Sequence, residues 1–318
     1  MSAKSKELRP QPILWEGHLE PRFQQRKKLI IGVATGWLTR EQNPTQPYTP
    51  EEIAKEVIDA YKAGASIWHV HVRHPQSGSL LLQAEERLEI HKQTCELVFQ
   101  ECPDIITDPS GADPLNDDSV EARVDSYFKP LVEENPHYAE IAVLNMGTLN
   151  MGVWPKQFVF LNRLPALLEQ VKALETLGVK PEFACYNLTM LEDVKEHFLF
   201  EESRPWYIST AQGIHNTMPA RFELTKIASE LLPQEEVVWQ MIPGGRNWLA
   251  LAVWAIMLGC DVVRVGKEDN IFVYPDQDAK ITHCSQAVKK VAAIARELGR
   301  EIATPMEARQ RLGLRSIT

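Results

Sequence analysis

His69 and His71 stand two residues apart in the largely apolar segment Ser66-Ile-Trp-His-Val-His-Val-Arg73. If this segment is a β-strand, its alternate residues project from one face, about 6.5–7 Å apart, so both imidazoles can reach one metal ion. A polar, glycine-containing stretch follows at residues 74–78, so the pair lies at the carboxyl end of the expected strand. In α/β folds that end carries the loops that build active sites. We interpret the pair as half of a metal site, while simple packing of two histidines stays open as an alternative.

A third ligand should come from the end of another strand, and Glu268 is the candidate. It follows the apolar segment 262–265, and Asp269 and Asn270 come directly after it. Two imidazoles and one carboxylate form a donor set that zinc accepts, with room left for a substrate. Beside such a ligand we interpret Asp269 as catalytic, although an Asp-Asn pair can also simply start a turn.

The composition limits the kind of partner. The chain has 318 residues, 44% of them hydrophobic, and a formal net charge of −9. This charge and the lack of a long basic run argue against nonspecific binding of nucleic acid. No run of eighteen apolar residues and no signal-peptide core occur, so we expect a cytoplasmic protein without membrane contact. Five cysteines without a Cys-x-x-Cys spacing fit a reducing compartment and argue against a thiolate zinc site.

Eight apolar segments are typical of strands, and helical patterns separate them. The first helix is expected to begin at Thr49, with Pro50 at its first position and Glu52 completing a capping box, and to stop at Gly64. Further helices are expected over residues 83–100, 158–178, 220–232, 248–259 and 281–299. The expected strands are 29–34, 66–72, 104–107, 139–144, 180–185, 206–210, 236–242 and 261–265.

This count of elements predicts the architecture. Eight strand–helix units in about 275 residues match a (β/α)8 TIM barrel, whose usual size is near 250 residues. A doubly wound sheet is the weaker alternative, because no Gly-x-Gly-x-x-Gly follows the first strand. We therefore expect a single α/β domain over residues 1–318, with an N-terminal extension at 1–27 and a C-terminal tail at 304–318.

The strand ends of such a barrel supply the remaining site candidates. We predict substrate contacts from Trp37, Arg73, Asn145 and Thr148, which follow the first, second and fourth strands. The turn Gly244-Gly245-Arg246 after the seventh strand is a second candidate for ligand binding. Backbone geometry alone can require two glycines there, and Arg73 can be a purely structural cation.

Several segments of the chain form a distinctive combination: Thr35-Gly36, Asn43-Pro-Thr-Gln-Pro47, Thr49-Pro-Glu-Glu52, Ala63-Gly-Ala-Ser-Ile-Trp-His-Val-His-Val-Arg73, Leu144-Asn-Met-Gly-Thr-Leu-Asn150, Pro181-Glu182 and Val263-Arg-Val-Gly-Lys-Glu-Asp-Asn270. Taken together, these motifs resemble the β-keto acid cleavage enzymes, of which 3-keto-5-aminohexanoate cleavage enzyme is the best-known type. The likeness runs from about Leu29 to Arg309 and ends in a similar Ala-Thr-Pro-x-x-Ala-Arg at 303–309.

The resemblance implies a zinc-dependent barrel, a homo-oligomer (dimer or tetramer), that converts a β-keto acid and acetyl-CoA to acetoacetate and a new CoA ester. The family's zinc ligands fall on His69, His71 and Glu268, and its arginine–aspartate pair falls on Arg264 and Asp269. With this co-substrate, Gly244, Gly245 and Arg246 become the candidates for binding CoA.

Two departures from the family pattern concern the substrate. Trp37-Leu38 stands where the best-known member has an acidic residue that binds the substrate amine, so we expect a substrate without an amino group. Pro109-Ser110-Gly111-Ala112 replaces Ser-Thr-Gly-Gly after the third strand, which leaves Ser110 as the candidate for the serine that assists proton transfer.

Two other classes of function compete with this interpretation. Zinc hydrolases of the amidohydrolase type also carry His-x-His on a barrel strand, but on the first strand, and here the pair is on the second. A non-catalytic binding protein that retains the barrel is the other alternative, and the altered serine segment favours it.

Overall fold

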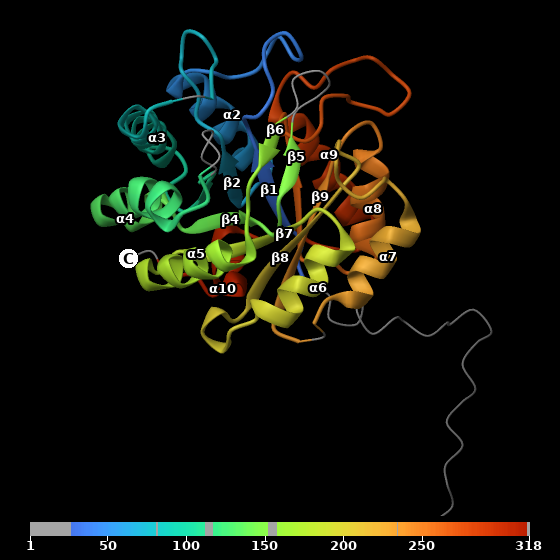
Figure 1. Ribbon diagram of the computed structural model, residues 1–318. Coiled ribbons are helices and arrows are strands. Elements are labelled where there is room, and N and C mark those ends of the chain that lie inside the picture. The colour runs from blue at the N-terminus through green and yellow to red at the C-terminus, as the bar shows by residue number, and fades with distance from the viewer. Residues whose placement is uncertain (1–26, 81, 112–116, 152–157, 234, 317–318) are drawn as a thin grey trace, which may run out of the picture.

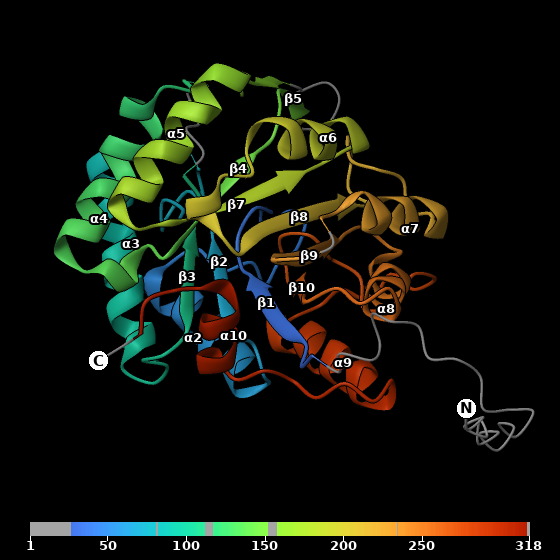
Figure 2. The same cartoon turned by 90° about the horizontal axis from the view of Figure 1, so that it is seen from below.

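Eight parallel strands form a nearly closed barrel, which confirms the predicted fold class (Figure 2). The computed structural model describes residues 27–316 except 81, 112–116, 152–157 and 234, so the predicted N-terminal extension lies outside the described residues apart from Lys27. The strand order is β3-β2-β1-β10-β9-β8-β7-β4. The barrel strands are β1 Ile30–Ala34, β2 Ile67–Val70, β3 Ile106–Pro109, β4 Ile141–Asn145, β7 Lys180–Cys185, β8 Trp206–Gln212, β9 Val237–Pro243 and β10 Val262–Val265.

The two ends of this sheet, β3 and β4, meet without a regular ladder. The Glu140 backbone nitrogen, just before β4, donates to the Thr107 carbonyl of β3 at 3.3 Å. This bond brings the first and last strands of the order together and closes the ring.

Helices cover the outside of the barrel (Figure 1). The predicted capping box of α2 is present, because the Thr49 side chain accepts from the Glu52 nitrogen and the Glu52 carboxylate accepts from the Thr49 nitrogen. Of the helices that the structure describes, none has the length and apolar character needed to cross a membrane. The helices are α2 Pro50–Lys62, α3 Ala84–Phe99, the π-helix η1 Glu121–Phe128, α4 Lys129–Glu134, α5 Leu164–Leu177, α6 Leu188–His197, α7 Phe222–Leu231, α8 Trp248–Met257, α9 Cys284–Glu297 and α10 Pro305–Leu312, with short 3-10 turns η2 Pro136–Tyr138 and η3 Glu201–Ser203.

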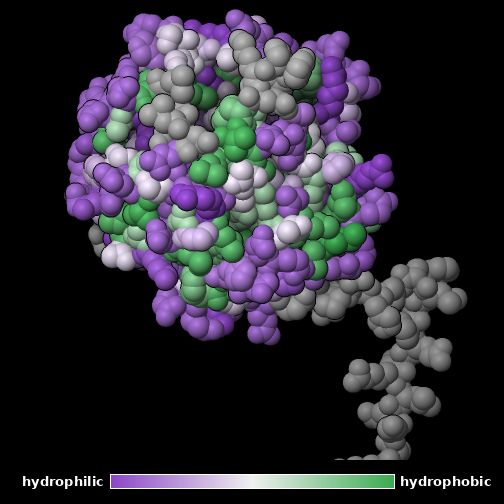
Figure 3. Space-filling view, in the orientation of Figure 1, coloured by the Kyte–Doolittle hydropathy of each residue, from purple (hydrophilic) through white to green (hydrophobic). Residues whose placement is uncertain are grey.

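The prediction of one helix over residues 158–178 was wrong at its start. Phe158–Phe160 is strand β6, which pairs antiparallel with β5, Leu149–Met151. Helix α5 begins only at Leu164, with Pro165 in its first turn. A proline is compatible with the first turn of a helix but not with its interior, so the helix does not extend back across Pro165, and Phe-Val-Phe prefers a strand. Phe158 and Val159 are exposed on this hairpin. Figure 3 shows hydrophobic surface in the region where Figure 1 places β5 and β6.

An apolar layer fills the amino-terminal end of the barrel. Helix α10, which falls within the predicted C-terminal tail, lies across this end in Figure 2 and contributes Ala308 and Leu312 to the layer. The tail is thus part of the folded core. The strand residues of the layer are Ile30, Ile67, Ile106, Ile141, Tyr207, Val238 and Val262.

Two residues further along most of these strands, the interior becomes polar. Because successive side chains on one face are two residues apart, the residues that follow the apolar layer point into the barrel above it. They are Gly32, His69, Asp108, Ser209, Gln240 and Arg264, and Glu182 of β7 joins them. The active site is therefore expected on a floor of buried polar groups.

Candidate active site

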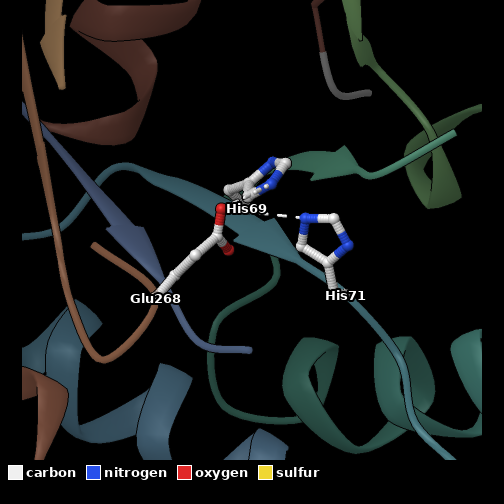
Figure 4. Close-up of side chains that lie close together, drawn as sticks. All are labelled: His69, His71 and Glu268. Atoms are coloured by element: carbon white, nitrogen blue, oxygen red, sulfur yellow. Dashed lines mark ion pairs between the residues drawn. The ribbon is translucent and has the colours of Figure 1, made fainter. Parts of the chain in front are cut away.

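The structure brings the three predicted metal ligands together. His69 lies on β2, His71 directly after β2, and Glu268 after β10. Their ligand atoms all lie within 4.8 Å of one another, and Figure 4 shows the side chains converging. The Glu268 Oε1 atom lies 3.5 Å from His69 Nε2 and 3.7 Å from His71 Nε2.

Gly266 lets the chain turn from β10 to Glu268. Its φ is +146°, and a Cβ atom there would lie 2.1 Å from the Ala34 carbonyl oxygen of β1. The Asn270 side chain fixes the turn, since its Oδ1 accepts from the Gly266 nitrogen at 2.7 Å and its Nδ2 donates to the Pro243 carbonyl at 2.6 Å. The close approach to β1 requires glycine and directs the following carboxylate over the end of that strand.

We therefore expect Gly266→Ala to lower the free energy of unfolding by about 2–4 kcal/mol, because it combines an unfavourable φ with a backbone clash. Gly299→Ala is the matched control, since Gly299 also has a positive φ of +79° but its added Cβ would meet nothing within 4 Å. Chemical denaturation of both variants measures the difference. Equal losses would contradict the clash that we describe.

Asp108 orients His69. The two residues face each other in the β2–β3 register, and Asp108 Oδ2 lies 2.9 Å from His69 Nδ1. This contact leaves His69 Nε2 to face Glu268 and His71. A carboxylate behind a histidine ligand is the usual arrangement in metal sites. In the sequence Asp108 directly follows the expected strand 104–107, but no local pattern indicates that it contacts a histidine.

The donor set fits a divalent metal ion. Glu268 Oε2 is buried and has no hydrogen-bond partner among the described residues. A buried carboxylate oxygen without a partner is unfavourable unless a cation or a donor meets it. The Glu268 carboxylate and the two imidazoles provide three ligands on one side of a position that borders a cavity.

Burial and charge act differently on the three groups. Burial lowers the pKa of His71 to about 3. Burial also opposes the charged form of His69, but Glu268 and Asp108 outweigh it and raise the pKa of His69 to about 10. Burial raises the pKa of Glu268, yet His69, Arg264 and His71 together hold it well below its ordinary value. The field at His69 thus favours positive charge.

Arg264 holds Asp269 in place beside the ligands. Its Nε donates to Asp269 Oδ2 at 3.1 Å and its Nη2 to Asp269 Oδ1 at 3.2 Å, and Nη2 also reaches Glu268 Oε1 at 3.1 Å. Gly32 pairs with Arg264 across β1 and β10, and a Cβ there would touch the arginine side chain at 3.4 Å. Burial raises the pKa of Asp269 to about 6 against the opposing charge of Arg264.

Glu182 is a buried carboxylate beneath this group that the sequence analysis noted only as part of a motif. Its Oε1 accepts from Ser209 Oγ at 2.5 Å and from Gln240 Nε2 at 2.8 Å, and Tyr207 donates to Gln240 at 2.7 Å. Burial raises the pKa of Glu182 to about 7. An acidic residue inside the apolar strand Lys180–Cys185 was the signal that could have singled it out.

A cavity of about 450 Å³ opens above His69, His71 and Glu268, and all three predicted catalytic residues line it. Trp37, Ser110 and Asn145 line it, as do Arg264 and Asp269. Trp37 also packs edge-on against His71, with 4.9 Å between ring centroids. Much of the remaining wall is apolar, and includes Val72, Leu80, Val124, Phe128, Leu144, Met151, Phe158, Phe160, Leu174, Ile214 and Ile242.

Other predicted contacts are not among the lining residues of this cavity. Arg73 is buried and donates to the Gly36 and Gly78 carbonyls. Thr148 exchanges hydrogen bonds with the Asn162 backbone at the base of the β5–β6 hairpin.

The turn after β9 is also not among the lining residues, although Gly244 packs against Ile214 and the Gly245 nitrogen donates to the Asp269 carbonyl at 3.0 Å. An added Cβ at Gly244 would lie 2.0 Å from Ile214, and one at Gly245 would lie 2.4 Å from the Gly213 carbonyl oxygen, so packing alone requires both glycines. Arg246 is exposed and forms an ion pair with Asp278. CoA binding by this turn stays a prediction.

Comparison with known proteins agrees with the resemblance that the sequence motifs indicate. A sequence model described as beta-keto acid cleavage enzyme matches residues 28–314. The 3-keto-5-aminohexanoate cleavage enzyme of Fusobacterium nucleatum is 35% identical over 295 residues, which cover 91% of this chain and 99% of that protein. The 3,5-dioxohexanoate:acetyl-CoA acetone transferase of Paraburkholderia graminis is 26% identical over 319 residues, covering 92% and 97%. The apo structure of ObcA matches with a TM-score of 0.71 at 19% identity, covering 85% of this chain and 66% of that one, which shows a shared fold.

Proposed function

Because the chain belongs to the beta-keto acid cleavage enzyme family, we propose that it uses zinc to convert a β-keto acid and acetyl-CoA to acetoacetate and a new CoA ester. A β-keto acid cleavage and transfer activity follows from membership itself. The zinc ion and the co-substrate are our proposal. The observation that carries it is the convergence of His69, His71 and Glu268 beside the Arg264–Asp269 pair in the lining of one cavity.

His69, His71 and Glu268 would hold the metal ion, and zinc suits two imidazoles and a carboxylate best. When bound, zinc supplies Lewis acidity that polarises the substrate ketone and acidifies the neighbouring methylene, worth several kcal/mol. Asp108 keeps His69 in the orientation that presents Nε2 to this point.

Asp269 is the proposed base. Its carboxylate lines the cavity, and the two hydrogen bonds from Arg264 fix its orientation. It would take a proton from the methylene between the ketone and the carboxylate of the substrate. The carbanion would then add to the thioester carbon of acetyl-CoA and expel the CoA thiolate, which would add to the former ketone carbon. Cleavage of the bond between that carbon and the former methylene carbon would give the new CoA ester and the carbanion of acetoacetate, which would take the proton back from Asp269.

Ser110 and Asn145 line the same cavity and are proposed to bind the oxygens of the substrate, with Ser110 assisting proton transfer. Acetyl-CoA appears in the name of the Paraburkholderia graminis relative, which supports the choice of co-substrate. The hydrolase and the non-catalytic protein considered from the sequence are not favoured by membership in this family. A homo-oligomer, dimer or tetramer, stays a prediction.

A panel of β-keto acids with acetyl-CoA tests this function. We expect the purified, zinc-loaded protein to form acetoacetate and a CoA ester from at least one of them, in equal amounts. Product formation without acetyl-CoA would indicate hydrolysis, and no turnover of any substrate in the presence of bound zinc would favour the non-catalytic alternative.

The wall of the cavity predicts which substrate is preferred. Trp37 stands near the metal ligands, and Arg87 and Arg123 also line the cavity, whereas its only carboxylates among the described residues are Glu268 and Asp269. A cationic tail would therefore be desolvated without a dedicated partner, while an apolar tail gains roughly 25 cal/mol for each Å² that it buries. We expect kcat/KM to be at least about tenfold higher for a neutral β-keto acid than for 3-keto-5-aminohexanoate, a difference of about 1.4 kcal/mol.

The comparison needs two substrates of similar length, measured with saturating acetyl-CoA. Trp37→Glu serves as the matched variant, because it restores an acidic side chain beside the metal ligands and should narrow the difference. A clear preference of the wild-type protein for the aminated substrate would overturn this prediction.

A further inference from the structure

Lys267, the residue before Glu268, is a fully buried cation outside the barrel interior. Its Nζ donates to Glu56 Oε1 of α2 at 2.8 Å and to the Thr45 carbonyl at 2.7 Å. Glu268, its neighbour, points the opposite way, toward His69 and His71. Lys267 thus anchors the segment after β10 on the side that faces α2, and Glu268 projects from the other side toward the two histidines.

Glu56 connects this ammonium group to a second helix. Its Oε2 accepts from the Cys284 nitrogen at 2.7 Å, at the first residue of α9, and its Oε1 lies 3.1 Å from His283 Nδ1. A carboxylate at a helix N-terminus is favourable because the free backbone N–H groups there carry partial positive charge. The Lys267–Glu56 pair therefore joins the segment after β10 to both α2 and α9.

The same pair holds the loop that carries Trp37. Thr45, whose carbonyl accepts from Lys267, lies in the loop between β1 and α2. That loop has two further anchors near the pair, since Gln46 donates to the Thr35 carbonyl at 2.8 Å and Asn43 donates to the Ile281 carbonyl at 2.9 Å. One ion pair thus connects the segment of a metal ligand with the loop that forms part of the cavity wall.

The strand ladder alone does not hold Glu268. The last residue of β10 that pairs with β1 is Val265, and the chain then turns at Gly266. We infer that the Lys267–Glu56 ion pair is a positioning device that sets the place of Glu268, and so the affinity of the metal site. This inference rests on the proposed function, because it assumes that Glu268 binds zinc.

The affinity for Zn²⁺, measured by competition with a chromophoric chelator, tests the inference together with the Tm of the metal-free protein. We expect Lys267→Met to weaken Zn²⁺ binding by about 10-fold to 100-fold, the usual effect of losing a group that orients a metal ligand. The Tm should fall by about 5–10 °C, because a buried carboxylate loses its cation.

Arg309→Met is the matched control. Arg309 of α10 is also buried and pairs with the buried Glu140 at the opposite end of the barrel. Its loss should lower the Tm by a similar amount but leave Zn²⁺ affinity within about twofold of wild type. Equal effects of the two variants on Zn²⁺ affinity would overturn the inference.

A double variant separates positioning from stability. Lys267→Met with Glu56→Gln removes both charges, while the amide oxygen can still accept from the Cys284 nitrogen at the start of α9, so no buried charge is left without a partner. We expect its Tm to recover while Zn²⁺ affinity stays weak. Recovery of both would overturn the inference. Should Lys267→Met not fold, Glu56→Gln provides the same comparison, because the amide keeps the shape of the side chain but not its charge.

The outcomes also distinguish this inference from the proposed function. If the wild type binds Zn²⁺ and neither Lys267→Met nor Glu56→Gln changes its affinity, the positioning role alone is overturned. No Zn²⁺ binding by the wild type would overturn the proposed metal site and the inference with it.

Discussion

Alanine at both His69 and His71 should leave the protein without bound divalent metal and without measurable turnover. The wild-type protein is expected to hold about one zinc ion per chain, with three protein ligands. Removal of two of them leaves only Glu268, and a single carboxylate does not retain the ion. Since Lewis-acid catalysis supplies several kcal/mol, kcat/KM should fall by about 10³-fold or more.

Metal analysis of the purified variants checks this prediction, with circular dichroism to verify the fold. His197→Ala is the control, because His197 lies on the surface of α6, outside the cluster of possible metal ligands, and its loss should change neither metal content nor turnover. Full zinc occupancy in the double variant would show that the ion binds elsewhere and would refute the assignment of the ligands.

The convergence of His69, His71 and Glu268 could be predicted from the sequence because local patterns determine it. His69 on β2 and His71 directly after it are two residues apart, the spacing at which side chains share one face of a strand. The apolar segment before Glu268 marks a second strand end. Apolar segments separated by helical patterns were likewise sufficient to predict the eight strands. In each case the information lies within about ten residues of the chain.

Contacts between strands that are distant in sequence could not be predicted in the same way. Asp108 acts on His69 only because β2 and β3 pair in a register that sets the two residues side by side. Lys267 contacts Glu56 although the two residues lie 211 positions apart in the sequence. No local pattern fixes such a register or such a contact, and therefore the supporting residues of the site became evident only in three dimensions.

The turn after β9 shows a sequence signal that has two possible causes. Two glycines and an arginine at a strand end resemble a ligand-binding loop, and Gly244 and Gly245 also pack closely against the loop after β8. A glycine has the same sequence signal whether a ligand or another segment of the protein approaches it. Only the neighbours of its α-carbon distinguish the two cases.

Asp269→Asn should remove turnover while leaving the metal site and the fold intact. The amide has nearly the shape of the carboxylate, but it does not accept a proton from the substrate. Arg264 can still donate to the amide oxygen of the asparagine. We expect kcat/KM to fall by at least about 10³-fold, within the range that general-base catalysis contributes. Steady-state kinetics and zinc content, measured on the same preparation, check both parts of this prediction.

Arg264→Lys tests whether Asp269 must also be oriented. The guanidinium reaches both oxygens of Asp269 and one of Glu268, through hydrogen bonds of 3.1–3.2 Å. A lysine ammonium is a compact charge that does not reproduce this planar pattern, so we expect turnover to fall although the positive charge is kept. If Asp269→Asn retained wild-type rates, the base would have to be another group in the cavity. If only Arg264→Lys retained wild-type rates, a positive charge near Asp269 would be sufficient and the paired hydrogen bonds would not be needed.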